Sequence, residues 1–364
     1  MLTIVSAIIV FGILIGVHEA GHLIAAKAVG VTVFEFAIGM GPKLFSFTKG
    51  GTKYSLRLLP LGGFCRMDGE DEASDNEGAL CNKPVWARML VVVSGAVMNI
   101  LLGFVVYVAC ISAYFPAISV NEVSVAMPGS PAYFAGIETG DRIVEINGDN
   151  VYTPEDISFE FLTVDVRDDI EMTVKRDGEK LTKTVKPALY IDEYKTEDGK
   201  VLGGYFADEN TPEEIKSSYG RYIVGCEFRS EPKTFFGVLK SAFFKSRTTF
   251  KTVIYSLKLL ISGNVGLNDV SGPVGIVNQI GSSAESGLLS LLMLMAMITI
   301  NLGIFNLLPI PALDGGRLLF LIIELIRRKP IPPEREGVVH FVGLALLMIL
   351  MLVVTANDIF RIVR

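Results

Sequence analysis

One short motif combines residue types and a spacing that suit metal-dependent hydrolysis: HEAGH at residues 18–22. On a helix, residues four positions apart lie on one face, so the imidazoles of His18 and His22 can bind one metal ion. Glu19 is next to the first histidine, where its carboxylate can take a proton from water on the metal. Zinc lowers the pKa of such water to about 7 and supplies hydroxide near neutral pH. The motif therefore predicts Zn²⁺ as cofactor, His18 and His22 as ligands, and Glu19 as the catalytic base.

A third ligand is needed, because a catalytic zinc ion usually has three protein ligands and one open position. The candidates are His340 and Asp314. Asp314 lies in a polar, proline-broken segment, residues 306–317, and non-helical backbone within a membrane is tolerated only where it is buried or lines a wet cavity. His18 lies about 24 Å along a helix from Leu2, near the membrane face where both candidates are expected. Depth therefore does not choose between them.

The surroundings of the motif favour a functional site. On a soluble helix, HExxH can be no more than a solvated face. Here residues 2–26 are otherwise apolar, and ionisable side chains are costly in a stretch of membrane length. A cleaved signal peptide ending near Ala26-Lys27-Ala28 is the rival interpretation of this stretch. It is disfavoured because no basic residue precedes the apolar run.

The composition indicates a membrane protein that carries a soluble insert. Half of the residues (50%) are hydrophobic and the mean hydropathy is +0.47. Four apolar stretches are long enough for a hydrocarbon core about 30 Å thick: residues 2–26, 85–115, 288–308 with a continuation at 318–326, and 338–354. In the second stretch Asn99 needs a polar partner, and three small residues favour close helix contact: Gly95, Ala96 and Gly103.

The regions between these stretches differ in composition. Residues 31–38 and 52–58 alternate and are rich in β-forming residues, which predicts short strands or hairpins. The acidic run at 68–77 is expected to be a solvated loop. Residues 117–230 form a polar, strand-rich insert that is long enough for a domain. The basic amphipathic segment 233–262 predicts a helix that lies on the membrane surface or packs on the insert.

The distribution of charge predicts an orientation. Basic residues follow the first span and lie between the third and fourth, so the positive-inside rule places these loops in the cytoplasm and the 117–230 insert outside. Arg361 and Arg364 oppose this orientation weakly. A net charge of −6 without a basic field argues against nucleic acid as a partner. The cysteines form no CxxC pair, which disfavours a thiolate zinc site and a disulfide framework: they are Cys65, Cys81, Cys110 and Cys226.

Three motifs in this order resemble the site-2 protease family of intramembrane zinc metalloproteases: HEAGH, then SGAVMN at residues 94–99, then NLLPIPALDGG at residues 306–316. The resemblance covers nearly the whole chain and is closest to the bacterial regulator-of-sigma-E protease branch. HExxH alone is moderately specific, but its combination with the LDG motif late in the chain is strong.

The resemblance implies a role for six residues. It assigns Glu19 as the catalytic base and three zinc ligands: His18, His22 and Asp314. It also implies that Asn306 and Pro311 help to hold the substrate. The strand-like region after the first span resembles the membrane-reentrant β element of the family. Such an element would offer an edge to an extended substrate segment, because a helix hides its peptide bonds.

Part of the insert resembles a bacterial PDZ domain: residues 128–136 (PGSPAYFAG) followed by 140–148 (GDRIVEING). One such domain is expected, with a long polar stretch at 191–219 before a final strand at 222–228. A PDZ fold can bind the new C-terminus of a substrate or block access, and the fold alone does not choose. SGPVG at residues 271–275 also matches the family and predicts a tight turn that re-enters the membrane.

The predicted fold class is a polytopic α-helical membrane protein of about four spans, with a membrane-reentrant β element and one extracytoplasmic PDZ-like α+β domain. The predicted segments are span 1 with HExxH (1–30), the cytoplasmic-side β element and acidic loop (31–84), span 2 (85–116), the PDZ-like domain (117–230), the interfacial helix and turn (231–284), span 3 with the LDG motif (285–330) and span 4 (337–358).

The predicted function is a zinc-dependent intramembrane endopeptidase of the bacterial inner or plasma membrane, with its active site near the cytoplasmic face. By resemblance, its partners are the lipid bilayer and single-span membrane protein substrates, such as anti-sigma factors or remnant signal peptides. The alternative is a membrane-anchored PDZ scaffold with a structural metal, which would need four closed protein ligands. A metal transporter would need polar ligands along its spans, and spans 2 and 4 are too apolar for that.

Overall fold

The computed structural model describes residues 1–364 except 71, 166–167, 196–199, 264–270, 332 and 364. The chain forms two compact units. One consists of Met1–Cys110 with Thr249–Arg364, and the other of Ile111–Thr248. Helices α2 (Val85–Tyr114) and α6 (Phe235–Ile261) carry the chain from one unit into the other.

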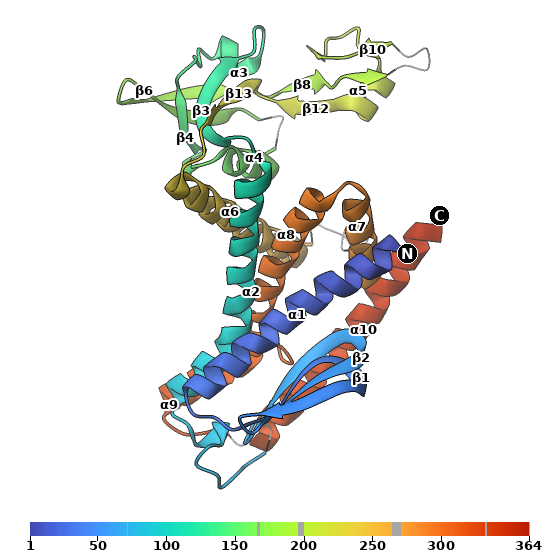
Figure 1. The fold of residues 1–364 in the computed structure, drawn as a ribbon. Helices are drawn as coiled ribbons and strands as arrows, with labels where there is room; N and C mark the ends of the chain where they lie inside the picture. The colour runs from blue at the N-terminus through green and yellow to red at the C-terminus, as the bar shows by residue number, and fades with distance from the viewer. Residues whose placement is uncertain (71, 166–167, 196–199, 264–270, 332, 364) are drawn as a thin grey trace. The chain divides into compact units, whose positions relative to one another are not determined.

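The first unit is mainly helical (Figure 1). Among the described helices, four are long and apolar enough to cross a membrane, and they lie in the four predicted stretches: α1 (Leu2–Ala28), α2, α8 (Leu288–Asn306) and α10 (Pro333–Val363). Large apolar side chains on α10, such as Phe341 at 73% exposure, have no protein cover, as expected of a surface that faces lipid. The third stretch is broken, since α8 ends at Asn306 and a separate helix, α9 (Asp314–Arg327), follows.

Small residues bring α2 and α8 together. A methyl group on Gly103 of α2 would lie 2.4 Å from Cγ1 of Ile300 on α8. One on Gly303 of α8 would lie 2.8 Å from the carbonyl oxygen of Ala96 on α2. A side chain at either glycine would push the helices apart, so the predicted close contact of the second span is confirmed.

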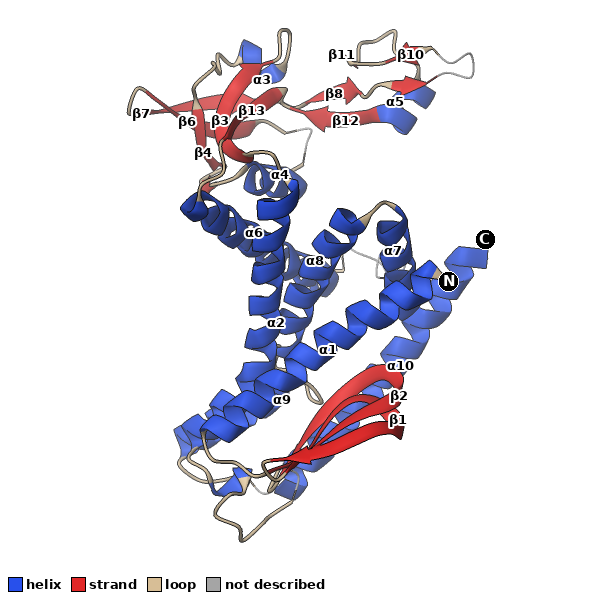
Figure 2. Ribbon diagram, in the orientation of Figure 1, coloured by secondary structure: helices blue, strands red, loops and turns tan. Residues whose placement is uncertain are grey.

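The strands after α1 are longer than predicted: β1 is Val33–Lys49 and β2 is Thr52–Met67. At Gly39 and Gly41 the backbone has φ of +87° and +81°, values that favour glycine, so β1 bends here instead of ending. The two strands make a curved antiparallel hairpin that lies along α1 (Figure 2).

The bend lets the hairpin fold over itself. Residues 35–38 of β1 pair with residues 53–56 of β2 on one side and with residues 63–66 on the other. Apart from β1, no described strand pairs with residues 63–66, so this end of β2 is an edge of the sheet. The opposite arm carries exposed aromatic side chains, including Phe45 (63% exposed) and Phe47 (50%).

The SGPVG segment begins a helix, so the predicted tight turn is wrong. Helix α7 (Pro273–Glu285) starts with proline at its first position, where the missing N–H is no loss. The backbone N–H groups of Gly272 and Gly275 donate to the buried carboxylate of Asp358 on α10, at 3.1 and 2.8 Å. Asp358 thereby satisfies donors at the start of α7 that no residue of the helix can satisfy.

The second unit is built on a sheet in the order β13-β3-β4-β6-β7, with β5 paired to β4. Its strands are β3 (Ile118–Ala126), β4 (Arg142–Ile146), β5 (Asp149–Asn150), β6 (Ile170–Arg176), β7 (Glu179–Val185) and β13 (Cys226–Glu231), and its helices are α3 (Pro131–Phe134) and α4 (Pro154–Thr163). Inward-facing side chains such as Ile143, Ile170 and Met172 are fully buried and form its core.

The long polar stretch at 191–219 holds further elements: β9 (Tyr194–Lys195), β10 (Val201–Leu202), β11 (Tyr205–Phe206) and α5 (Glu213–Tyr219). Residues 196–199 within it lie outside the described residues. Strand β8 (Ala188–Ile191) lies between β11 and β12 (Gly220–Ile223) in a second small sheet. The single final strand predicted at 222–228 is wrong, because Gly225 adopts φ +79° and separates β12 from β13.

Helix α6 packs on the second unit over its N-terminal half. Ala242 is fully buried, Phe244 stacks on Tyr152 at 4.6 Å between ring centroids, and Thr248 donates to the buried carboxylate of Asp156. Lys245 pairs with Glu155 at 2.9 Å. This part of the predicted basic face is therefore paired within the protein, which agrees with the alternative that the helix packs on the insert.

Candidate metal centre

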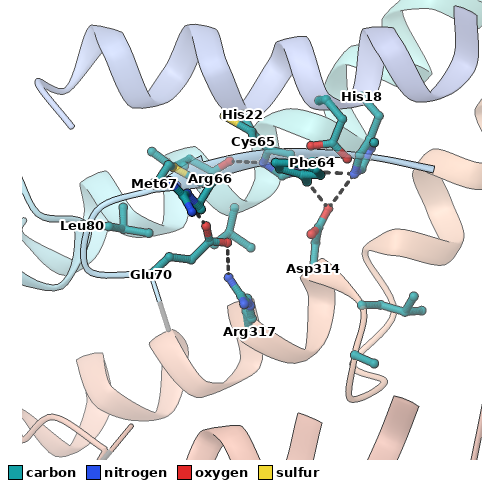
Figure 3. Close-up of a pocket in the computed structure, with 16 residues that line it drawn as sticks. His18, His22, Phe64, Cys65, Arg66, Met67, Glu70, Leu80, Asp314 and Arg317 are labelled. Carbon is teal, nitrogen blue, oxygen red and sulfur yellow. Dashed lines mark hydrogen bonds and ion pairs between the residues drawn. The ribbon is translucent and has the colours of Figure 1, made fainter. Parts of the chain in front are cut away.

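The structure brings His18, His22 and Asp314 together (Figure 3). The two Nε2 atoms are 3.2 Å apart, and Oδ2 of Asp314 lies 3.3 Å from Nε2 of His18 and 3.5 Å from Nε2 of His22. Ligand atoms about 2.0–2.1 Å from a tetrahedral zinc ion lie about 3.3–3.4 Å from one another. The three atoms therefore form one face of a tetrahedron of the size that zinc requires.

The donor chemistry also fits zinc. Two imidazoles and one carboxylate are a common set at a catalytic zinc ion, which keeps a fourth position open. Oδ2 of Asp314 is buried and has no hydrogen-bond partner among the described residues. A buried carboxylate oxygen without a donor is costly unless it is paired with a cation, so the site suits a metal ion.

His22 is held in the orientation that a ligand needs. Its Nδ1 lies 2.9 Å from the carbonyl oxygen of Val91 on α2. A carbonyl can only accept, so Nδ1 carries the hydrogen and the lone pair is on Nε2, at the cluster. Gly95 of α2 makes room for the ring, since a methyl group there would lie 2.4 Å from Nε2 of His22 and 2.8 Å from Cε1 of His18.

His18 has a polar neighbour in Asn99, the residue that the sequence leaves without a partner. The side-chain nitrogen of Asn99 lies 3.4 Å from Nδ1 of His18, and its side-chain oxygen is buried without a hydrogen-bond partner in the described chain. Turning the amide by 180° would set that oxygen against Nδ1–H of His18. Nδ1–H of His18 would then donate to an acceptor, as in His22, and the lone pair of Nε2 would be left for a metal.

Asp314 is the first residue of α9, and the loop before it folds back tightly. A methyl group on Gly315 would lie 2.1 Å from the carbonyl oxygen of Leu308, and one on Gly316 would lie 2.5 Å from that of Ile310. The two glycines after Asp314 are thus required by the close approach of the loop backbone. This geometry explains why the LDG motif continues as GG.

The structure separates the two candidates for a third ligand. Asp314 is in the cluster, whereas Nδ1 of His340 accepts a 2.9 Å hydrogen bond from the backbone N–H of Ala312. In the described chain, the side chains at this site that could hold a metal ion are those of His18, His22 and Asp314. His340 supports the loop instead.

The cluster opens into a cavity of about 350 Å³. Glu19 lines it beside both histidines, and a methyl group on Gly63 of β2 would lie 3.0 Å from Cγ of Glu19. The edge of the hairpin, residues 63–67, forms one wall of this cavity. Cys65 of β2 lies in the same wall and is outside the cluster of His18, His22 and Asp314.

An ion pair across the cavity goes beyond what the sequence predicts. Nη1 of Arg317, one turn beyond Asp314, lies 2.5 Å from Oε1 of Glu70 (Figure 3). Glu70 belongs to the acidic run at 68–77, so the expectation of a solvated loop is wrong at this residue. The sequence holds a weak signal for the pair, because Arg317 follows Asp314 at the three-residue spacing of one helix face.

The two predicted substrate-binding residues do not line this cavity. Asn306 is the last residue of α8. Pro311 lines a separate apolar cavity of about 360 Å³ against α10, and a methyl group on Gly343 of α10 would lie 2.3 Å from Cβ of Pro311. Their role in holding substrate stays a prediction.

Comparisons with known proteins identify the family of this chain. The model of peptidase family M50 matches residues 6–350. A Clostridium perfringens chain provisionally named a zinc metalloprotease is 38% identical over 358 residues, which cover 98% of each chain. The zinc metalloprotease RasP of Geobacillus kaustophilus is 32% identical, with 98% of this chain and 97% of the relative covered. The regulator of sigma-W protease RasP of Bacillus subtilis is 33% identical, with 99% and 98% covered. Four of its described helices are apolar enough to cross a membrane and the match covers nearly its full length, so the chain is a membrane protein that belongs to peptidase family M50, the site-2 protease family.

Proposed function

We propose that this protein is a zinc-dependent endopeptidase that cleaves the transmembrane segments of other membrane proteins. One observation carries the proposal: three donor atoms stand 3.2–3.5 Å apart at a cavity that Glu19 also lines, between helices apolar enough to span a membrane. Ionisable groups in such helices are costly and are kept for function. The names of the relatives, zinc metalloproteases, support the same activity.

His18, His22 and Asp314 would hold the zinc ion, whose chemistry is to acidify water and polarise a peptide carbonyl. Glu19 would accept a proton from the attacking water and return it to the leaving amide nitrogen. The carbonyl of Val91 and the amide of Asn99 would fix the two imidazoles so that their Nε2 lone pairs converge. The surrounding helices would exclude bulk water from the reaction.

The hairpin edge would hold the substrate. A helical segment hides its peptide bonds, so a transmembrane substrate must become extended before it can be cut. Residues 63–67 form strand backbone at the cavity, beside Glu19. They pair with β1 on one side, and no described strand pairs with them on the other side. Addition of the substrate as a further strand would bring its backbone to the metal centre in a defined register. Asn306 and Pro311 would support the neighbouring part of the substrate.

The setting of this chemistry is part of the proposal. The basic loops after α1 and before α10 support a metal centre near the cytoplasmic face of a bacterial inner or plasma membrane. The hairpin, with its exposed Phe45 and Phe47, would re-enter the membrane. Residues 117–230 would be an extracytoplasmic PDZ-like domain that either binds or screens substrates.

Single-span proteins are the proposed substrates, with anti-sigma factors and remnant signal peptides as examples. The name of the Bacillus subtilis relative, regulator of sigma-W protease, supports a link to sigma-factor control.

The full chain, purified in detergent, tests this function. Zinc per chain and cleavage of a tagged transmembrane reporter are measured for wild type, Glu19→Gln and Asp314→Ala. We expect about one zinc per chain in wild type and in Glu19→Gln. Cleavage should fall about 10²- to 10⁴-fold in Glu19→Gln, and Asp314→Ala should lose both metal and cleavage. Undiminished cleavage by Glu19→Gln, or a wild type without metal, would overturn the mechanism.

A further inference from the structure

The backbone just before the proposed metal ligand Asp314 is strained. Ala312 has φ +75°, in the left-handed region that Cβ makes unfavourable. The other non-glycine residues with positive φ in the described chain are Asn147, Asp177 and Arg328. Asn and Asp tolerate this region through local hydrogen bonds, and Arg328 ends a helix. Ala312 has neither explanation, so the surrounding structure must impose its conformation.

Helix α10 supplies that constraint at two points on one face. The N–H of Ala312 donates to Nδ1 of His340 at 2.9 Å. One turn along, Gly343 packs directly on Pro311, with 2.8 Å from the position of a glycine methyl to the carbonyl oxygen of Pro311. Residues three apart on a helix are neighbours, so His340 and Gly343 together contact the consecutive residues Pro311 and Ala312.

The protonation of His340 follows from its partners. A backbone N–H can only donate, so Nδ1 of His340 carries the lone pair and Nε2 carries the hydrogen. Nε2 faces Oε1 of Glu336 at 3.7 Å, one turn earlier on α10, and the ring packs near Phe320 of α9 at 5.8 Å between centroids. His340 is thereby oriented by groups on two helices.

The backbone conformation at Ala312 sets the position of Asp314 at the start of α9. Leu313 has extended backbone (φ −102°, ψ 164°) and precedes the helix, and Asp314 is its first residue. Oδ2 of Asp314 accepts no hydrogen bond in the described chain, and it lies 3.3 and 3.5 Å from the Nε2 atoms of His18 and His22. Its place beside them therefore depends on the direction of the backbone. A change in φ at residue 312 would swing this carboxylate away from both histidines.

We propose that His340 is a positioning residue for the metal centre: by accepting the N–H of Ala312, it holds the left-handed backbone that aims Asp314 at His18 and His22. This role rests on the proposed function, in which Asp314 is the third zinc ligand. His340 contacts the chain at Ala312, two residues before Asp314, and is not a ligand itself.

The test uses the full chain in detergent and reads the metal directly. The affinity for zinc is measured by competition with a chelator, and the visible absorption of the Co²⁺-loaded protein reports the ligand geometry. His340→Leu should lower the affinity about 10- to 100-fold, as loss of an outer hydrogen bond to a metal site does, and change the Co²⁺ spectrum. His340→Asn should keep both near wild type, because Oδ1 of Asn and Nδ1 of His are both attached to Cγ and both accept. Leu344→Ala, at a residue of α10 that is 51% exposed, is the matched control and should have no effect.

A second pair of variants tests the route through Ala312. Glycine adopts positive φ without strain, so Ala312→Gly should bind metal nearly as wild type does. His340→Leu should then cost much less affinity when it is combined with Ala312→Gly than when it is made in the wild-type chain. Equal losses in the two backgrounds, equal losses in the Asn and Leu variants, or wild-type affinity in His340→Leu would each overturn the proposal.

Asp314→Ala in the same series separates this proposal from the function. If it keeps full metal affinity, both the ligand assignment and the role of His340 fall. If it loses the metal while His340→Leu does not, only the positioning role falls.

Discussion

The side-chain amide of Asn99 on α2 lies 3.4 Å from Nδ1 of His18 on α1. Asn99 is itself completely buried, so the contact is made away from solvent. Thr299 of α8 donates to the backbone carbonyl of the same residue at 3.3 Å. One position on α2 therefore links a proposed metal ligand to the third apolar helix.

This contact predicts that Asn99→Leu weakens zinc binding about 10- to 100-fold, because the Nδ1–H of His18 loses the acceptor that the turned Asn99 amide would supply. Asn99→Asp keeps an acceptor of the same shape and should retain the metal. Chelator competition on the purified chain checks both variants. Equal affinities of the wild-type and Leu proteins would show that His18 does not need Asn99.

Gly95→Ala is expected to disrupt the metal centre. The added methyl group would lie 2.4 Å from Nε2 of His22 and 2.8 Å from Cε1 of His18, closer than real Cβ contacts allow. The rings must move, so the protein should lose at least about tenfold in zinc affinity together with its cleavage activity. The matched control is Gly12→Ala on α1, where the new methyl group meets nothing within 4 Å. Zinc content and reporter cleavage should stay at the wild-type level in that control.

The sequence predicts the cluster of His18, His22 and Asp314 better than it predicts the protein around it. HEAGH works as a local signal, because helix geometry alone brings His18 and His22 to one metal. Depth does not separate Asp314 from His340, since both are expected near one membrane face. Only the folded loop shows that Asp314 reaches the histidines and that His340 contacts Ala312.

Other features depend on contacts that no local pattern records. The predicted strands are too short because Gly39 and Gly41 resemble strand ends in sequence but make a bend inside β1. The acidic run around Glu70 is typical of a solvated loop, and the partner of this residue, Arg317, is 247 residues away. Long-range ion pairs and bends of this kind need the three-dimensional structure.

The Glu70–Arg317 pair predicts an energetic coupling at the cavity. Both side chains are partly buried, 20% and 30% exposed, so neither charge is fully solvated when its partner is removed. Glu70→Ala and Arg317→Ala should each lower reporter cleavage while zinc stays bound, because neither residue is in the metal cluster. The double variant should lose less than the sum of the two, with a coupling energy of about 0.5–3 kcal/mol. Strict additivity of the two losses would show that the ion pair does not shape the cavity.

Asp358 is expected to stabilise the first unit without touching its chemistry. Asp358 is 3% exposed, and its carboxylate accepts hydrogen bonds from the N–H groups of Gly272 and Gly275 at the start of α7. Loss of such a cap costs about 1 kcal/mol, which corresponds to roughly 2–4 °C in Tm for a unit of this size. Thermal unfolding of Asp358→Ala in detergent should show this shift, with zinc content unchanged below the transition. A Tm equal to that of wild type would mean that water or lipid replaces the cap.

The second unit should lose stability in acid through the pair Asp141–Arg176. Burial alone would raise the pKa of the Asp141 carboxyl, but Arg176 donates to both of its oxygens at 2.7 and 2.8 Å, and the N–H of Glu138 adds a third bond. The net effect holds this pKa below its ordinary value of 3.8. A carboxyl whose pKa is lower in the folded state stabilises the fold fully above its unfolded pKa, and this contribution disappears as the pH falls through the folded pKa.

Protection of strand β4 from hydrogen exchange, corrected for the intrinsic rate at each pH, measures this contribution in the full chain. Protection should be level from pH 7 to pH 5 and decline below about pH 4, where unfolded aspartate begins to take up protons. Asp141→Asn keeps the shape and removes the titration, so it should be less protected at pH 7 and decline less below pH 4. If wild type and Asp141→Asn lose protection in parallel below pH 4, a different carboxyl controls the acid response of this unit.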